Sequence, residues 1–332
     1  MRTYRSLLVI FSFTLSLFSL MLFSCKEDEP PTKPKLSFDK SSMTVNEADG
    51  EIEVKIKLDK PTSERFFITY ELDGTATDKV NAGSNAYDYE ITDDYLEAKI
   101  DKDDTVANIK IKLSSDFEIE DPETILISIK SVDSENIEIT REDDIKITIN
   151  QEDGIVAVLA WPAQTATGKA DMDLVLRAGA STSTWDGILN GSIQESFSSP
   201  EFIFIPKVVE FKAYGLSYVY YDGTFDPLDF TSTFIDVVNG TLEAASQRQT
   251  FNGKYTIANI NKWTDINTSI VVQTFEKVGT EFKNISTIKT PASGSRSNTS
   301  SIVSLNHLEL KKKPGKQVNS KLMLELIKEL KD

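Results

Sequence analysis

Alternation of apolar and polar residues is the feature that most constrains how this chain can fold. From Ile52 to Leu58 every second residue is apolar and the residues between are charged, and the same period of two returns within 109–113, 125–129 and 145–149. A period of two places successive side chains on opposite faces of a strand, whereas a helix needs a period near 3.6. Turn residues separate these runs at short intervals. The pattern therefore predicts half-buried antiparallel strands in a β-sandwich.

Negative charge is concentrated in the same part of the chain. Residues 36–153 carry 31 acidic and 13 basic side chains, a net charge of −18, whereas the whole chain has a net charge of −16. Proteins that bind nucleic acids need clustered Lys and Arg side chains that contact phosphates. No stretch of the sequence has that character, so we expect no nucleic-acid partner.

The acidic residues fall at predicted strand ends, within short motifs that resemble the Calx-beta domain. These motifs are SFDKSSMTVNEADGEIEVKIKL, YELDGTA, YDYEI, DFEIEDPETILISI and ITINQED. Together they cover almost all of residues 36–153. The resemblance implies a Calx-beta or immunoglobulin-like sandwich for this segment.

The resemblance also implies a cofactor, Ca²⁺, held by carboxylates at one end of the sandwich. Matched motif by motif, the candidate metal ligands are Glu47, Asp88, Asp116, Glu120, Glu123, Glu152 and Asp153. Calcium suits such a set because it takes about 6 to 8 hard oxygen ligands at irregular angles. The chain departs from the family where two serines precede Asp116 and where Asn150 and Gln151 precede Glu152. The alternative is an acidic sandwich that keeps the fold without the metal.

The N-terminus has the layout of a secretory signal. Basic residues precede an apolar segment from Leu7 to Phe23, and the only cysteine of the chain follows in the sequence LFSC. LFSC resembles the lipobox of bacterial lipoproteins, which implies a signal peptide at residues 1–24 and lipidation of Cys25. Acyl chains give durable membrane attachment, at roughly 0.8 kcal/mol per buried methylene. An uncleaved anchor is the alternative, since about 17 apolar residues is the lower limit for spanning a bilayer.

Residues 25–35 are predicted to form the lipidated cysteine and a proline-stiffened tether. A lysine followed by three acidic residues, 26–29, resembles the export tag of some Gram-negative lipoproteins, and a solvated linker is the alternative. We expect a protein of the outer membrane that is lipid-anchored and faces the cell exterior.

Residues 154–310 have a different composition and are predicted to form a second all-β domain, a sandwich or jelly roll. Charge becomes sparser and strand-like apolar runs continue, among them IVAVLAW and DMDLVLRA. In the second run Asp171 and Asp173 share one face of a strand. They could share a cation there, but we expect them on the solvated side, with Met172 and Leu174 pointing inward.

Aromatic residues are frequent in the second domain and have two interpretations. They are Phe211, Tyr214, Tyr218, Tyr220, Tyr221, Phe225, Tyr255 and Trp263. Core packing is the usual role of strand aromatics, and we expect it for most of them, with either Tyr220 or Tyr221 exposed. The alternative is stacking on sugar rings, which would make residues 154–300 the site of a surface glycan-binding or glycan-degrading accessory protein.

The C-terminal residues 311–332 are predicted to form a basic linker and a short amphipathic helix. Leu322, Leu326 and Leu330 share one helical face. A free helix of about a dozen residues is unstable in water, so it should dock on its own domain or on a partner.

Catalytic motifs are missing from the sequence. The chain has a single histidine, His307, and no GxSxG, HExxH or glycine-rich phosphate loop. We therefore expect a binding or adhesion module of the cell surface and not an enzyme. It would be held at the membrane through Cys25, and its partner would be an extracellular protein or glycan.

Overall fold

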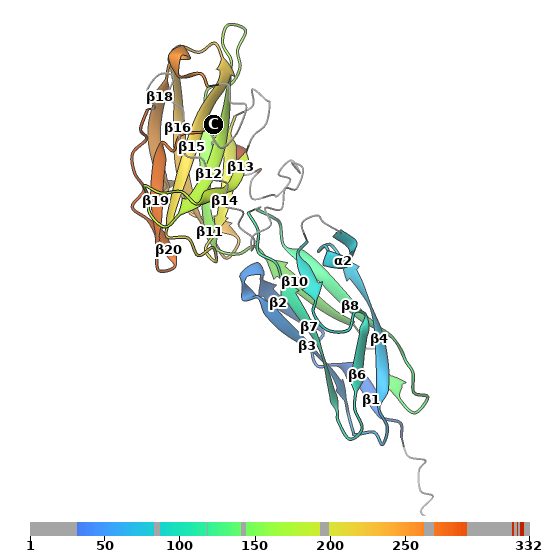
Figure 1. The fold of residues 1–332 in the computed structure, drawn as a ribbon. Helices are drawn as coiled ribbons and strands as arrows, with labels where there is room; N and C mark the ends of the chain where they lie inside the picture. Colours follow the sequence, from blue (N-terminus) through green and yellow to red (C-terminus); the bar gives the residue numbers. More distant parts are fainter. Residues whose placement is uncertain are drawn as a thin grey trace, which may run out of the picture.

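A computed structural model describes residues 32–82, 87–117, 119–140, 144–192, 199–261 and 269–290, together with Lys321, Leu324 and residues 326–328. Cys25, His307 and Trp263 lie outside the described residues. The described part is all-β, as predicted, with four five-stranded sheets that pair into two sandwiches (Figure 1). Among the described residues, no helix has the length and apolar character needed to cross a bilayer.

The first sandwich contains ten strands. They are β1 (Lys35–Phe38), β2 (Ser42–Asn46), β3 (Glu51–Leu58), β4 (Phe66–Gly74), β5 (Tyr89–Ile91), β6 (Glu97–Ile100), β7 (Val106–Leu113), β8 (Glu123–Val132), β9 (Glu138–Ile139) and β10 (Asp144–Asn150). One sheet has the order β5-β7-β3-β1-β9 and the other β2-β10-β8-β4-β6. The 3-10 turn η1 (Glu47–Asp49) follows β2, and the short helix α2 (Lys79–Ala82) follows β4.

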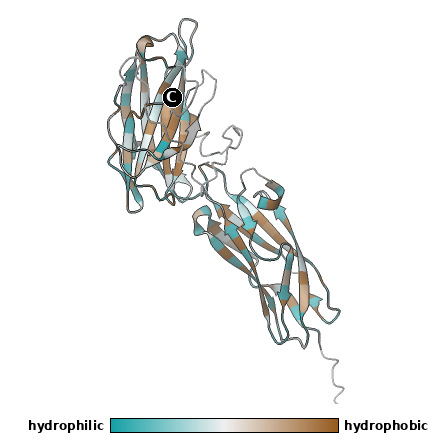
Figure 2. Cartoon of the chain, viewed as in Figure 1, coloured by the Kyte–Doolittle hydropathy of each residue, from teal (hydrophilic) through white to brown (hydrophobic). Residues whose placement is uncertain are grey.

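Alternating burial in the first sandwich confirms the predicted strand pattern. In β7, residues Ile109, Ile111 and Leu113 are buried, and the residues between them are exposed or half-buried. Apolar and polar bands alternate along these strands in Figure 2. Each fully buried isoleucine or leucine stabilises the fold by roughly 1.5 to 3 kcal/mol relative to exposure. The two sheets share one core, and the charged side chains within the strands are exposed or half-buried.

The described residues of the second sandwich also form ten strands. They are β11 (Gly154–Ala160), β12 (Ala170–Gly179), β13 (Gly187–Ser192), β14 (Glu201–Pro206), β15 (Ala213–Gly223), β16 (Leu228–Val238), β17 (Thr241–Leu242), β18 (Gln249–Tyr255), β19 (Gln273–Val278) and β20 (Glu281–Lys283). One sheet has the order β14-β11-β16-β17 with β18 also paired to β16, and the other has the order β13-β12-β15-β19-β20. Two 3-10 turns, η2 (Ala245–Gln247) and η3 (Ile257–Asn259), complete the described elements.

The predicted solvation of Asp171 and Asp173 is wrong, because strand β12 is buried on both faces. Met172 and Leu174 point into the core as predicted. Asp171 is 5% exposed and Asp173 2%. On the same outer face of β12, the Arg177 guanidinium donates to Ser269 Oγ at 3.1 Å. Ser269, which lies between β18 and β19 in the sequence, therefore helps to cover this face.

The aromatic residues of the second sandwich confirm the core-packing interpretation. Tyr214, Tyr218, Tyr220 and Tyr255 are all buried in one core, where the rings of Tyr214, Tyr218 and Tyr255 contact phenylalanines. Tyr221, next to Tyr220, is half-buried and is not part of that core. Neither of the two neighbouring tyrosines is exposed, although one was expected to be, and most of the aromatic rings lie where no sugar can stack on them.

Candidate functional site

Strand pairing brings the predicted acidic residues to one end of the first sandwich. Strand β10 runs parallel to β2, and Asn150 pairs with Asn46, so Glu152 leaves the sheet beside η1, which begins at Glu47. On the other side of β10, Ile149 pairs with Glu123. Parts of the sequence 100 residues apart therefore meet at this end through backbone pairing alone.

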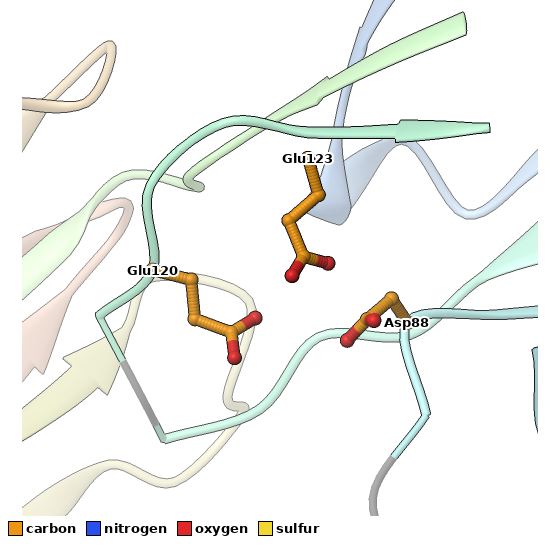
Figure 3. A group of neighbouring side chains, drawn as sticks. All are labelled: Asp88, Glu120 and Glu123. Atoms are coloured by element: carbon orange, nitrogen blue, oxygen red, sulfur yellow. The ribbon is translucent and has the colours of Figure 1, made fainter. Parts of the chain in front are cut away.

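Asp88, Glu120 and Glu123 form the centre of the acidic end. One carboxylate oxygen from each lies within 4.8 Å of the others, and Figure 3 shows the three side chains turned toward a common space. Oxygens that share one calcium ion at about 2.3 to 2.6 Å lie at most about 5 Å apart. The spacing of these three carboxylates therefore fits a single ion. Asp88 is buried, and the two glutamates are half-buried.

Asp88 and Glu123 are positioned by the turn that contains the GTA motif. Thr77 N donates to Asp88 Oδ2 at 2.5 Å, and Asp88 N donates back to Thr77 O at 2.9 Å. On the other side of the turn, Thr75 N and Ala76 N both donate to the carbonyl oxygen of the residue after Glu123, at 2.9 and 3.0 Å. One short turn therefore sets the distance between two of the three carboxylates.

Gln151 links the acidic residues to one another, a role that its sequence position did not indicate. Its Oε1 accepts from Glu120 N at 2.6 Å, and its Nε2 donates to Glu47 Oε2 at 3.2 Å. Ser115 acts similarly, donating to Glu152 Oε2 at 3.0 Å. The sequence presented these positions only as departures from the family pattern. In the fold, the neutral side chains hold the carboxylates in place.

Burial and mutual repulsion raise the pKa values of Glu47 and Glu152. Burial is the main cause for Glu47, whose pKa rises to about 9, with further contributions from the charges of Glu152, Asp116, Glu120 and Asp88. Burial likewise raises the pKa of Glu152 to about 8, against the hydrogen bond from Ser115, and the charges of Asp116 and Asp153 add to the rise. Ionising either carboxyl therefore costs free energy as long as no cation balances the charge.

The two remaining candidates lie at the edge of the site. Asp116 lines a cavity of about 330 Å³ between its own loop and the second sandwich. Asp153 accepts a hydrogen bond through Oδ1 from Asn239 N at 2.8 Å, so its carboxylate is engaged by the second sandwich. Asp88, Glu120 and Glu123 thus form the centre, Glu47 lies within electrostatic reach of Asp88, Glu120 and Glu152, and Asp116 and Asp153 border the second sandwich.

The donor set suits a hard divalent cation. All of the candidate ligands are carboxylates, whereas zinc sites are built mainly from Cys and His. Their oxygens come from a strand start, a loop and a 3-10 turn, which fits the irregular coordination of calcium better than the strict octahedron of magnesium.

Comparison with known proteins bears on the first sandwich most directly. Residues 30–153 match the Calx-beta domain family. The apo form of the Calx CBD1 domain aligns at 21% identity and a TM-score of 0.30, over 36% of this chain and 98% of that one. The calcium binding domain CBD12 of CALX1.1 aligns at 18% identity and a TM-score of 0.29, over 58% and 82%.

Other solved structures align with a larger part of the chain. A candidate carbohydrate binding protein from Bacteroides ovatus aligns at 10% identity and a TM-score of 0.27, over 70% of this chain and 73% of that one. Among curated proteins, no match is found. The family match confirms the resemblance seen in the sequence motifs, all of which lie within the matched residues 30–153.

Proposed function

We propose that the first sandwich binds Ca²⁺ at its acidic end. The observation that carries this proposal is the convergence of Asp88, Glu120 and Glu123, whose oxygens lie within 4.8 Å of one another. Three like charges at that spacing repel one another strongly unless a cation lies between them. Calcium removes this repulsion and uses the type of ligand present.

Glu47 and Glu152 are further sources of ligand oxygens at the same end of the sandwich. Both are buried, and Glu152 Oε1 has no hydrogen-bond partner among the described residues. A buried carboxylate oxygen of this kind normally has a partner, and a nearby cation would supply one. Ser115 and Gln151 would then act by orienting the carboxylates, as groups around a metal site commonly do.

Calorimetric titration tests the proposal on the full chain freed of divalent ions. Calcium should bind saturably, and magnesium should bind more weakly, because magnesium requires a tight octahedron and gives up its water reluctantly. Both titrations should be run at the same ionic strength, so that screening of the acidic surface is equal. Absence of a saturable calcium signal would leave a Calx-beta fold without its metal.

We further propose that the chain works as a binding or adhesion module on the cell surface and is not an enzyme. The support is the sequence: a lipobox-like LFSC, an acidic and proline-rich tether, and the lack of catalytic motifs. Its partner would be an extracellular protein or glycan. A rigid calcium-stabilised sandwich next to the tether suits a protein that must hold its shape outside the cell.

Cys25→Ser tests the proposed location. If Cys25 carries the lipid, the serine variant should leave the membrane fraction or accumulate unprocessed. The reason is that the variant lacks the acyl chains whose buried methylenes hold the protein at the membrane. The measurement is fractionation of cells followed by detection of the chain, with Ser24→Ala, which keeps a small residue before the cysteine, as the control. Unchanged processing and membrane association of Cys25→Ser would rule out the lipoprotein assignment.

A further inference from the structure

The outer face of one sheet in the second sandwich carries an apolar cluster to which three parts of the chain contribute. The sheet residues in this cluster are Val156, Val158, Phe204, Ile235 and Val237. The first sandwich adds Ile119, which is 7% exposed, and the C-terminal segment adds Leu326, which is fully buried. The contact thus joins both sandwiches and the end of the chain.

Ile119 belongs to the loop that carries one of the central carboxylates. This ligand loop, residues 114–117 and 119–122, joins β7 to β8. Glu120 follows Ile119 directly, and the loop ends at Glu123. The packing of Ile119 on the second sandwich therefore bears on where the Glu120 carboxylate lies.

The C-terminal segment contacts the same loop through a hydrogen bond. Lys321 N donates to Asp121 Oδ1 at 2.9 Å, across 200 residues of sequence. The described residues of this segment are helical, and Leu326 is fully buried, whereas Leu324 is 54% exposed. One end of the segment is thus fixed to the ligand loop, and one face of it packs on the second sandwich.

The other side of the ligand loop borders open space beside the second sandwich. There Ser115, Asp116 and Phe117 border the cavity of about 330 Å³, whose opposite wall includes Val209 and Phe211 of the second sandwich. Open space beside the loop gives it room to shift if the contacts of Ile119 and Asp121 are lost. Those contacts are therefore well placed to decide the loop position.

We propose that the C-terminal segment is a positioning element for the cation site, acting through Leu326 and through the Lys321–Asp121 hydrogen bond. The proposal rests on calcium binding by the first sandwich. By linkage, docking of the segment and binding of calcium must strengthen each other by the same factor. The C-terminal segment thus covers the apolar outer face of the second sandwich. Through the ligand loop, it raises the affinity of the first sandwich for calcium.

The test compares two leucines of one segment in the full chain. Leu326→Ala should weaken calcium binding at least about 5-fold, the lower end of typical couplings between sites. Leu324→Ala removes the same atoms from an exposed position and should leave the affinity unchanged. Calcium should in turn slow hydrogen exchange of the Lys321 amide, which a segment that merely covers the sheet would not show.

Asp121 provides a second, independent pair of variants. Asp121→Asn keeps an acceptor oxygen for Lys321 N, whereas Asp121→Ala does not, and both remove the same charge. Calcium should therefore bind more weakly to the alanine variant than to the asparagine variant.

Calcium binding by the unaltered chain distinguishes failure of the positioning role from failure of the proposed calcium site. If it binds calcium and Leu326→Ala binds equally tightly, the positioning role is overturned while the proposed function stands. If the unaltered chain does not bind calcium, both proposals fall.

Discussion

Calcium should raise the melting temperature of the first sandwich by several degrees. A ligand that binds only the folded state, at about 100 times its dissociation constant, stabilises that state by roughly 2.7 kcal/mol. In a domain of this size each kcal/mol moves the midpoint by a few degrees. The measurement is thermal unfolding of the full chain in calcium, in magnesium and in chelator, at fixed ionic strength.

Glu123→Gln should abolish this response to calcium. The amide keeps the shape of the side chain but removes one of the three central charges. In chelator the variant should be as stable as the unaltered chain or slightly more stable, because repulsion among the carboxylates falls. The matched control is Glu97→Gln, which removes a charge from an exposed position of the same sandwich and should keep the full calcium response. Superimposable curves for the unaltered chain in calcium and in chelator would contradict the account.

Gly74→Ala should destabilise the first sandwich by roughly 3 kcal/mol or more. Gly74 has a φ of +121°, and a β-carbon there would lie 2.1 Å from the carbonyl oxygen of Thr124. Backbone strain alone costs about 1 to 3 kcal/mol, and relieving the clash would also break the hydrogen bonds that Thr75 and Ala76 donate to the same oxygen. The measurement is urea unfolding of the full chain in chelator.

Gly50→Ala is the control for the Gly74 variant. Gly50 also has a positive φ, of +73°, but nothing lies within 4 Å of the position of its β-carbon. Only the positive-φ backbone conformation should cost free energy there, about 1 to 3 kcal/mol. Equal losses at the two glycines would mean that close approach to Thr124 is not what makes Gly74 necessary. Because Thr124 follows Glu123, the Gly74 variant should also bind calcium more weakly.

The first sandwich is readable from sequence because each of its sheets has one face in water. Solvent requires polar side chains at every second position, and β7 preserves that alternation along its whole length. Strand β12 is buried on both faces, so the same rule wrongly predicts a solvated side for Asp171 and Asp173. Ser269, which helps to cover this strand, lies about 90 residues further along the sequence. The local pattern of β12 therefore cannot indicate that its outer face is covered.

The sequence predicts the carboxylates of the candidate site, but it does not predict the neutral side chains that form hydrogen bonds around them. Motifs identify acidic residues at strand ends, and β-sheet pairing then brings Asp88, Glu120 and Glu123 together. Gln151 could not be recognised in this way, because an amide at a strand exit is usually a solvated side chain. Its importance arises from two hydrogen bonds that only the folded chain brings within reach.

Amphipathic spacing in the C-terminal segment predicts a buried face but not the surface that buries it. The position of Leu326 on the second sandwich depends on an apolar outer sheet face and on Ile119 from the first sandwich. The sequence of the segment itself does not indicate either of these contacts.

The most direct measurement of the central claim is a crystal structure grown in calcium, with anomalous scattering used to locate the ion. The account predicts an anomalous peak between Asp88, Glu120 and Glu123, with carboxylate oxygens at about 2.3 to 2.6 Å. The peak should be absent from crystals of Glu123→Gln grown in the same solution. No peak at saturating calcium, or peaks only at positions away from these three carboxylates, would contradict it.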